Sequence, residues 1–376
     1  MSKKKVAVIF GGQSTEHEVS RVSAQSVINN IDRSKYDVVM IGITKDGRWL
    51  PYSGPAGLLG TGEWQAAAEA EVKGLLESGC GAEAESRELE NGTRGILAAA
   101  EKDGRPVDVV FPVLHGCNGE DGTIQGLFEL AGVPYVGCGV LSSAVGMDKG
   151  YSKIVFEKEK IPQGKYLVFT RKQISKDTDK LAAEVEKLLT YPCFVKPSNA
   201  GSSVGVSKAH DRSELVAAMI KAARFDRRVL VEEFIDGREI ECAVLGNDDP
   251  IASIAGEIIP CNEFYDYEAK YSSGDNSKIV IPAQIPEETM KKVREYAVRA
   301  FKALDCSGLA RADFFVHKDT GEIYINELNT LPGFTSISMY PKLWEATGLP
   351  YSELISRLVE LALERFEDNR KEIDGI

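Results

Sequence analysis

The stretch RADFFVHKDTGEIYINELN, residues 311–329, reads as two β-strands joined by a polar turn. A hairpin centred on that turn sets Asp313 opposite Glu327. The same register sets Arg311 opposite Asn329, and all four side chains share one face because strand side chains point the same way at every second residue. Opposed carboxylates destabilise a strand pair unless a cation neutralises them, and Mg²⁺ is typically held by one or two carboxylates together with substrate phosphates. This face therefore predicts a magnesium–phosphate site beside an arginine.

The same alternation also fits an ordinary hairpin with one solvated face. Half-exposed antiparallel strands normally alternate polar and apolar side chains in this way. The hairpin by itself leaves both interpretations open, so the choice rests on the other segments of the chain.

The length and charge of the chain narrow its class. At 376 residues it is long enough for two or three domains. The 57 acidic and 45 basic residues give a net charge of −12, which opposes non-specific binding to nucleic acid or to an anionic membrane surface. No stretch approaches the roughly 20 apolar residues of a membrane helix, and the start, MSKKKVAVIFGG, predicts a strand rather than a signal peptide. We expect a soluble, cytoplasmic, multidomain enzyme.

The cysteines point to the same compartment. Seven of them are scattered along the chain without a CxxC pair. An odd number at such spacings indicates reduced thiols in a cytoplasm and argues against structural zinc.

The order of expected elements divides the chain into parts 1–146, 147–228 and 229–376. In the first part, strands alternate with helices, which indicates a Rossmann-like α/β domain with a parallel sheet. The strands are expected at 5–10, 36–43 and 107–113, and the helices at 19–31 and 124–131.

The rest of the chain has a different pattern. The second part has a glycine-serine loop at 199–205 and a helix at 212–224. The third, which we expect to begin with the strand at 229–231, has antiparallel strands and helices and indicates an α+β domain. The segment 55–105 reads as an insertion with some helix and no convincing strand.

The loop KPSNAGSSVGVSK, residues 196–208, is a candidate phosphate site. Its glycines and serines let backbone amides approach and cradle phosphate oxygens, although an ordinary hairpin turn has the same composition. It is not a Walker motif. Lys196 at its start and Lys149 in the MDKG segment supply ammonium groups suited to phosphates.

The stretch VLVEEFIDGREIE, residues 229–241, places Glu232 at the end of an apolar strand and Glu239 after a turn. These carboxylates suit hydrogen bonds from an amine and a ribose hydroxyl, and a pair of solvated glutamates is the alternative. The apolar strand indicates that Glu232 is partly buried, and buried carboxylates are rarely left without partners.

Two loops of the first part are candidate substrate sites. Glu16, in GGQSTEHEVS, follows the carboxyl end of a strand, where open α/β sheets bind ligands. It could bind the ammonium group of an amino acid, or Ser14 or Thr15 could simply cap the next helix. His115 has the analogous place after another strand, where a hydrogen-bonded structural histidine is the alternative.

Two segments near the carboxyl end complete the candidates. The irregular stretch NEFYDYEAKYSSGDNSK, residues 262–278, is long for a connection and has the character of a lid, with Lys270 and Tyr271 at its tip. A packed surface loop is the alternative. In LNTLPGFTSISMY, Ser338 precedes a helix whose first backbone amides suit a carboxylate or an oxyanion.

Taken together, these motifs give the chain a specific resemblance. It resembles the D-alanine–D-alanine ligases of the ATP-grasp superfamily over essentially its whole length, and the segment before Arg105 resembles the larger Gram-positive type and the vancomycin-resistance ligases. The motifs that carry the resemblance are GGQSTEHEVS, LHGCNGEDGTIQG, MDK, VKPSNAGSSVG, VEEFIDGREIE, FYDYEAKY, ARADFF and NELNTLPGFTS.

The resemblance implies a Rossmann-like domain followed by a two-domain ATP-grasp fold that binds ATP between its sheets. It implies a cytoplasmic homodimer that joins two D-alanines through a D-alanyl phosphate for peptidoglycan precursors. Two Mg²⁺ ions, with Mn²⁺ as an alternative, would be held by Asp313, Glu327 and Asn329. A ligase that uses D-serine or, less well, D-lactate as second substrate is the alternative, and an idle ATP-grasp scaffold or a ligase for other carboxylates are rival classes.

The resemblance also implies roles for single residues. The ATP site would include Lys149, Lys196, Ser203, Glu232, Glu233, Ile235, Glu239, Phe264 and Lys270. The substrate site would include Glu16, Val19, His115, Arg311, Gly333, Ser338 and Met339. The residues closest to the chemistry would be Glu16, Ser202, Tyr271, Arg311 and Ser338. Glu233 departs from the family pattern, because many relatives carry lysine or glutamine there.

Overall fold

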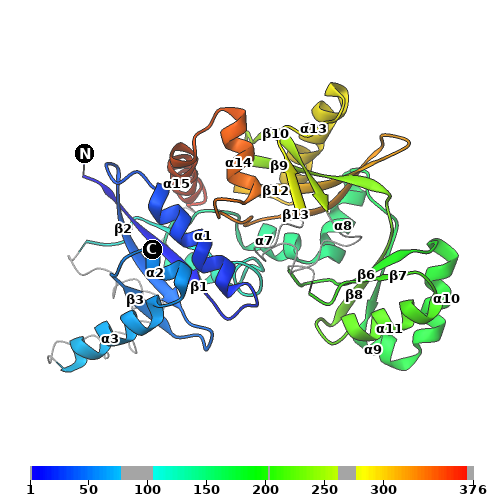
Figure 1. Ribbon diagram of the computed structural model, residues 1–376, viewed down its shortest axis with the longest axis horizontal. Helices are drawn as coiled ribbons and strands as arrows, with labels where there is room; N and C mark the ends of the chain where they lie inside the picture. The colour runs from blue at the N-terminus through cyan, green and yellow to red at the C-terminus, as the bar shows by residue number, and fades with distance from the viewer. Residues whose placement is uncertain (1, 78–104, 202–203, 261–276, 371–376) are drawn as a thin grey trace, which may run out of the picture.

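The computed structural model describes residues 2–77, 105–201, 204–260 and 277–370, and it contains three β-sheets that follow one another along the chain (Figure 1). The strand orders are β3-β2-β1-β4, β5-β8-β6-β7 and β11-β10-β9-β12-β13. The first sheet lies at one end of the molecule, and the other two lie beside each other at the opposite end.

The first sheet confirms the α/β prediction. β1 (Lys4–Gly11) pairs in parallel with β2 (Tyr36–Ile43) and β4 (Val109–Val113). Its apolar run is fully buried, as expected for a parallel strand covered on both faces. The helices beside the sheet are α1 (His17–Asn30) and α6 (Thr123–Ala131).

An edge strand that the sequence did not suggest extends this sheet. β3 (Trp49–Tyr52) pairs antiparallel with β2. It has only four residues, including Pro51, a residue that sheets tolerate at an edge. The insertion follows with α2 (Gly57–Thr61) and α3 (Trp64–Glu77). Trp64 is buried edge-on against Phe10, with ring centroids 4.8 Å apart, so α3 covers the sheet.

The second sheet is antiparallel and includes a strand that we expected in the third part. β8 (Arg228–Glu233) pairs with β5 (Tyr166–Thr170) and β6 (Cys193–Pro197), so it belongs to the central sheet. An apolar run shows that a strand is buried but not which strands flank it. The remaining elements are β7 (Ser207–Ala209), α9 (Arg171–Lys176), α10 (Thr178–Leu188) and α11 (Arg212–Ala222).

The third sheet is antiparallel, which confirms the α+β prediction. One face packs in a common core with α13 (Glu287–Ala303), and the other contacts α14 (Met339–Thr347) at one end. Its strands are β9 (Gly237–Gly246), β10 (Ile251–Pro260), β11 (Ser277–Val280), β12 (Gly308–His317) and β13 (Ile323–Asn329). The helices α7 (Val140–Met147) and α8 (Lys149–Lys158) also contact this sheet. Among the described helices, none combines the length and apolarity needed to cross a bilayer.

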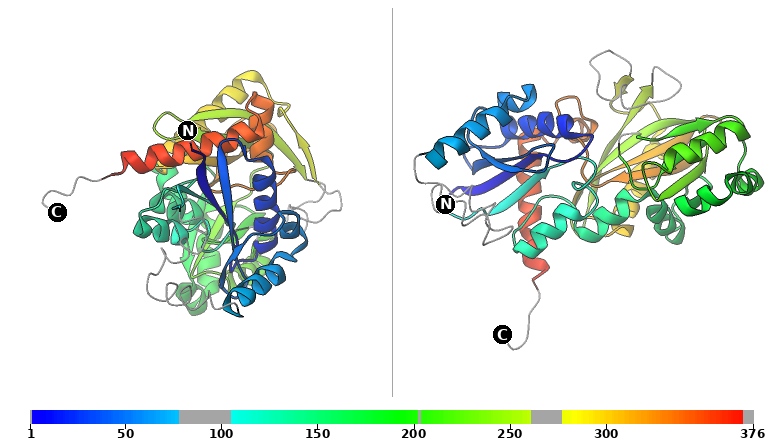
Figure 2. Two further views of the ribbon diagram at one scale, coloured as in Figure 1. Left: turned by 90° about the vertical axis from the view of Figure 1, so that its left-hand side faces the viewer. Right: turned by 90° about the horizontal axis from the view of Figure 1, so that it is seen from below.

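The last described helix brings the C-terminal part of the chain into contact with its N-terminal domain. α15 (Tyr351–Asp368) packs against α1 and β4 of the first sheet (Figure 2). The Tyr351 hydroxyl donates to the carbonyl oxygen of Phe334 at 2.7 Å and lies 3.2 Å from Ser26 Oγ. The loop before α14 is therefore held directly against the N-terminal sheet.

The packing of α3 on β2 can be tested with one methyl group. A Cβ added at Gly42 would lie 2.1 Å from the buried ring of Trp64. We expect Gly42→Ala to lower the free energy of unfolding by about 1 to 3 kcal/mol because the indole has no room to retreat. At Gly57 an added Cβ meets nothing within 4 Å, so Gly57→Ala is the control. Thermal unfolding measures both, and equal melting temperatures would contradict this packing.

Candidate active site

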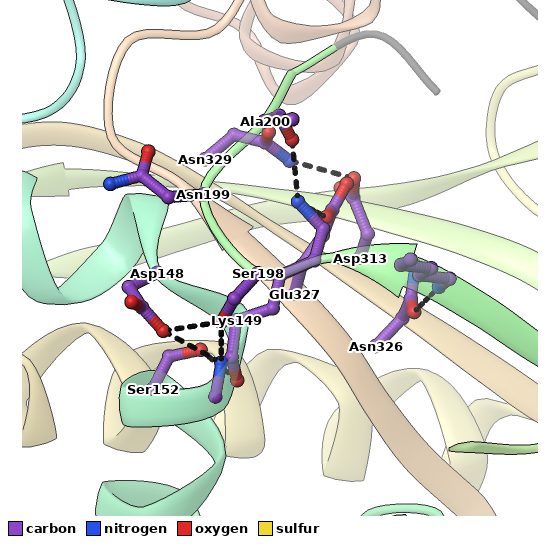
Figure 3. A network of polar contacts seen from close by, with 12 residues as sticks. Asp148, Lys149, Ser152, Ser198, Asn199, Ala200, Asp313, Asn326, Glu327 and Asn329 are labelled. Carbon is purple, nitrogen blue, oxygen red and sulfur yellow. Dashed lines mark hydrogen bonds and ion pairs between the residues drawn. The ribbon is translucent and has the colours of Figure 1, made fainter. Parts of the chain in front are cut away.

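The predicted hairpin register is present in the structure. Arg311 lies opposite Asn329 and Asp313 opposite Glu327. Arg311 donates from Nε to Asp313 Oδ1 and from Nη2 to Asp313 Oδ2, both at 2.7 Å. Asn329 Nδ2 also donates to Asp313 Oδ2, at 2.8 Å (Figure 3). The polar side chains thus form one connected group rather than a row of separate solvated residues.

A β-bulge that the sequence did not suggest interrupts the hairpin. The register shifts after Asp313, so that Phe314 pairs with Ile325 and Asn326 is the extra residue. Lys196 Nζ donates to Asn326 Oδ1 at 3.3 Å. Bulges occur beside active sites because they redirect a side chain, and this one brings Asn326 to the central sheet.

A third strand contributes a carboxylate that the sequence analysis missed. β9 pairs with the other edge of β12 and places Glu241 opposite Asp313. Glu241 Oε2 lies 3.0 Å from Arg311 Nε. Burial alone would lower the pKa of Arg311, but the charges of Asp313 and Glu241 raise it well above its usual value. Arg311 is therefore a fixed cation held by Asp313 of its own strand and by Glu241 of the neighbouring strand β9.

Lys149 joins the hairpin to the glycine-serine loop. Its Nζ lies 3.1 Å from Glu327 Oε2 and donates to the carbonyl oxygen of Ala200 at 3.1 Å. The preceding Asp148 caps α8 by accepting from two backbone amides, and Ser198 Oγ donates to it at 2.6 Å (Figure 3). The MDK motif and the loop after Lys196 are thus in direct contact.

Two lysines hold Glu232. Lys196 Nζ forms an ion pair with one of its oxygens, and Lys153 Nζ lies 3.0 Å from the other. Burial would raise the pKa of Glu232, but Lys153 and Lys196 lower it to about 2. The expected burial of Glu232 is confirmed, and Lys153 is a further residue that the sequence analysis did not find.

The other expected ATP-site residues lie where the second and third sheets meet. Glu233 Oε1 accepts a hydrogen bond from the backbone amide of Lys165 at 2.7 Å, so its carboxylate is bound to the main chain just before β5. Ile235 is half-buried and packs beside Gly164. Glu239 lies two residues before Glu241 on β9, so strand alternation turns it to the same face.

Glu16 lies between two loops. Its buried carboxylate lies so close to Gly116 and Gly201 that an added Cβ would lie 2.5 and 2.7 Å, respectively, from Oε2. No side chain caps α1, and Ser14 Oγ accepts from the amide of Glu16 at 3.1 Å. The capping interpretation is therefore wrong, and Glu16 links the N-terminal sheet to the glycine-serine loop.

His115 is hydrogen-bonded on both sides. Its Nδ1 lies 3.2 Å from the carbonyl oxygen of Leu331 and its Nε2 lies 3.1 Å from Ser23 Oγ. Ser23 Oγ also accepts from the amide of Phe334 at 3.3 Å. Burial lowers the pKa of His115, which agrees with a neutral ring that donates to Leu331 and accepts from Ser23. His115 thus ties the loop before α14 to the N-terminal sheet, while Val19 of α1 is also buried.

Glu120 was not identified from the sequence. It accepts from the amide of Gly116 at 2.6 Å. Burial and the negative charge of Glu16 raise the pKa of Glu120 to about 8. The raised pKa favours the protonated carboxyl group, which can donate a hydrogen bond.

The turn before α14 is compact. Ser338 Oγ lies 2.7 Å from Thr335 Oγ1 and accepts from the Thr335 amide at 3.0 Å, so it braces the turn and does not cap α14. An added Cβ at Gly333 would lie 2.8 Å from Ser338 Oγ, and Met339 is buried. The expected residues that lie outside the described part of the chain are Ser202, Ser203, Phe264, Lys270 and Tyr271.

The donor set of the hairpin fits a hard divalent cation. Asp313, Glu327 and Asn329 offer only oxygen ligands, and within the described residues no third carboxylate, imidazole or thiol completes a protein-only metal cage. Mg²⁺ uses one or two carboxylates and leaves other positions to phosphates and water. The adjacent cations, Lys149 and Arg311, show that this cluster of carboxylates needs positive charge.

Comparisons with known proteins agree with this geometry. Residues 5–138 match the family model "D-ala D-ala ligase N-terminus", and residues 155–360 match "D-ala D-ala ligase C-terminus". A D-alanine–D-alanine ligase of Ruminiclostridium cellulolyticum is 67% identical over 99% of this chain and 98% of its own. One from Acetivibrio thermocellus is 63% identical over 99% of both chains.

Solved structures are similar over almost the whole chain. The VanG D-Ala:D-Ser ligase of Enterococcus faecalis has a TM-score of 0.79 and 40% identity, covering 96% of this chain and 100% of its own. The D-alanine–D-alanine ligase of Coxiella burnetii has a TM-score of 0.76 and 35% identity, covering 97% of both. These ATP-grasp neighbours confirm the expected fold.

The paired lysines make a prediction about pH. Because the pKa of Glu232 falls from 4.5 to about 2 on folding, its ion pairs stabilise the fold above about pH 4.5 and lose this effect as pH falls towards 2. We expect Glu232→Gln to be less stable than the wild type at neutral pH, with the gap narrowing below pH 4.5. Urea unfolding across this range measures it, with the exposed Glu184→Gln as control. A gap that widens on acidification would refute the assignment.

Proposed function

Since the chain belongs to the D-alanine–D-alanine ligase family, we propose that it joins two D-alanines into D-alanyl-D-alanine for peptidoglycan precursors. The enzyme is an ATP-dependent, ADP-forming ligase. The carboxylate of the first D-alanine attacks the γ-phosphate of ATP and gives D-alanyl phosphate and ADP. The amine of the second D-alanine then attacks the carbonyl carbon of this intermediate, and phosphate leaves.

One observation carries the proposal. The ammonium group of Lys149 touches both Glu327 and the carbonyl oxygen of Ala200, so the hairpin, α8 and the glycine-serine loop meet at one point. A lysine held between a carboxylate and a small-residue loop is placed to contact a phosphate that enters there. Lys196 lies on the adjoining strand and reaches Asn326 and Glu232.

The chain's residues have separate tasks in this reaction. Lys149 and Lys196 hold the phosphates, Glu232 lies near the adenine and Glu239 binds the ribose. Asp313, Glu327 and Asn329 would hold two Mg²⁺ ions, or Mn²⁺ in their place. The bound metal would offset the repulsion between ATP and an anionic nucleophile.

Different loops of the chain form the two amino-acid sites. Glu16, wedged between two glycines, binds the ammonium group of the first D-alanine, with Val19 beside it. His115 positions the loop that carries Gly333, because it holds the carbonyl oxygen of Leu331.

The second D-alanine lies by Gly333, Ser338 and Met339. Arg311 polarises the acyl phosphate carbonyl and stabilises the oxyanion that forms there. This proposal also includes a lid, a cytoplasmic location and a homodimer. It includes the expected roles of Ser202, Ser203, Phe264, Lys270 and Tyr271.

The metal assignment has a direct test. We expect Glu327→Gln to lower D-alanine-dependent phosphate release by about 100-fold or more, because it removes a charged oxygen ligand. Circular dichroism should show an unchanged fold. The control is Glu322→Gln, an exposed residue just before β13, which should keep full activity. Undiminished turnover by Glu327→Gln would refute the assignment.

Product analysis tests the substrate. With ATP, Mg²⁺ and equal concentrations of D-alanine and D-serine, we expect D-alanyl-D-alanine to predominate, since relatives that are 67% and 63% identical are named D-alanine–D-alanine ligase. Mass spectrometry of the products decides this. A predominance of D-alanyl-D-serine would favour the activity named for the Enterococcus faecalis neighbour.

A further inference from the structure

Arg311 is held by two carboxylates of different kinds. Asp313 lies on the same strand and takes both Nε and Nη2, whereas Glu241 lies on the neighbouring strand β9 and contacts Nε at 3.0 Å. Asp313 also accepts from Asn329 and belongs to the proposed metal site. Glu241 is not part of that donor set.

The two anchors respond differently when a cation arrives. Asp313 has about four acceptor positions, of which Arg311 takes two and Asn329 one, so a cation that uses the rest would share the charge of this carboxylate with Arg311. Glu241 pairs with Arg311 from β9 by charge and not by a hydrogen bond, because Nε donates to Asp313, and this ion pair involves none of the proposed metal ligands. It is therefore the anchor that persists while Asp313 is shared.

Burial strengthens the effect of this anchor. The side chains of Glu241 and Arg311 are only 9% and 18% exposed. A buried pair of opposite charges interacts strongly, and removing one partner leaves an uncompensated charge. The hydrogen bonds of Arg311 to described residues come from Nε and Nη2, and none comes from Nη1. The carboxylates hold one edge of the guanidinium and leave the other for a ligand.

We propose that Glu241 is a positioning residue that holds Arg311 with its Nη1 edge turned towards the reacting carbonyl. The inference rests on the proposed function in one respect, the role of Arg311 at the acyl phosphate. Glu241 itself touches no substrate in this scheme. It acts only through Arg311, so its removal should affect catalysis and leave ATP binding unchanged.

The test uses Glu241→Gln, which keeps the size of the side chain and removes its charge. We expect kcat to fall by about 10- to 100-fold, the usual cost of losing a residue that orients a group in the site. The KM for ATP and the Kd for ADP with Mg²⁺, measured by calorimetry, should stay within about twofold of wild type. A fall in nucleotide affinity with unchanged kcat would overturn the proposal.

The matched control is Glu257→Gln. Glu257 is also a buried glutamate of this sheet, and it accepts two hydrogen bonds from Arg238, at 2.7 and 2.6 Å. It pairs with Ile240, so it faces the side of the sheet opposite to Glu241. The control should lose stability and keep its kcat. Equal effects of the two variants on kcat would show that Glu241 is only structural.

A double-mutant cycle separates this inference from the proposed function. If Glu241 acts through Arg311, the double variant Arg311→Lys with Glu241→Gln should have nearly the same kcat as Arg311→Lys alone. Additive losses would overturn the inference. Full turnover by Arg311→Lys would instead refute the role of Arg311 in the proposed function. A lower kcat in Arg311→Lys together with an unchanged kcat in Glu241→Gln would leave the proposed function intact. It would overturn only the positioning role of Glu241.

A second variant covers the case in which Glu241→Gln does not fold. Glu241→Asp keeps a buried charge but withdraws the carboxylate from Nε by one methylene. We expect a kcat between those of the wild type and the glutamine variant, with an unchanged Kd for ADP and Mg²⁺. A wild-type kcat in Glu241→Asp would contradict a role that depends on the contact.

Discussion

The site depends on the compensation of buried charge where the second and third sheets meet. Asp313, Glu327 and Glu241 lie opposite one another on adjacent strands, an arrangement that would separate those strands if it were not neutralised. Arg311 and Lys149 supply the compensation within the chain. A second cluster, with Glu232 between Lys153 and Lys196, repeats the pattern on the central sheet. Lys149, proposed for phosphate, is therefore already in contact with Glu327, proposed for metal, whereas Lys196 is paired with Glu232.

This arrangement has a consequence for ligand binding. A phosphate that approaches Lys149 competes with Glu327, and a cation that approaches Glu327 competes with Lys149. Under the proposed function, nucleotide and metal that enter together would satisfy both partners at once. Arg311 is different, because its pairs with Asp313 and Glu241 keep it in place on the strand.

The N-terminal sheet reaches the same region by uncharged contacts. His115 and Ser23 hold the loop at Leu331 and Phe334, and Tyr351 of α15 holds Phe334 from the other side. Because these bonds are neutral and buried, they depend little on salt or on ligand charge. They hold the loop before α14 against the N-terminal sheet, where the proposed function places the second amino acid.

The sequence by itself determined the elements whose information is local. The hairpin register follows from a two-residue period and one turn within 19 residues, and the parallel sheet follows from alternating strands and helices. The motifs also sufficed to recognise the family, and they predicted candidate site residues whose roles stay predictions. Only the tertiary structure decided the membership of β8 in the central sheet, the bulge at Asn326, and the contacts of Glu241, Lys153 and Glu120. The physical reason is that each of these features depends on which strand or helix lies alongside. Packing between segments far apart in the chain decides that neighbour, and a local sequence pattern does not contain this information.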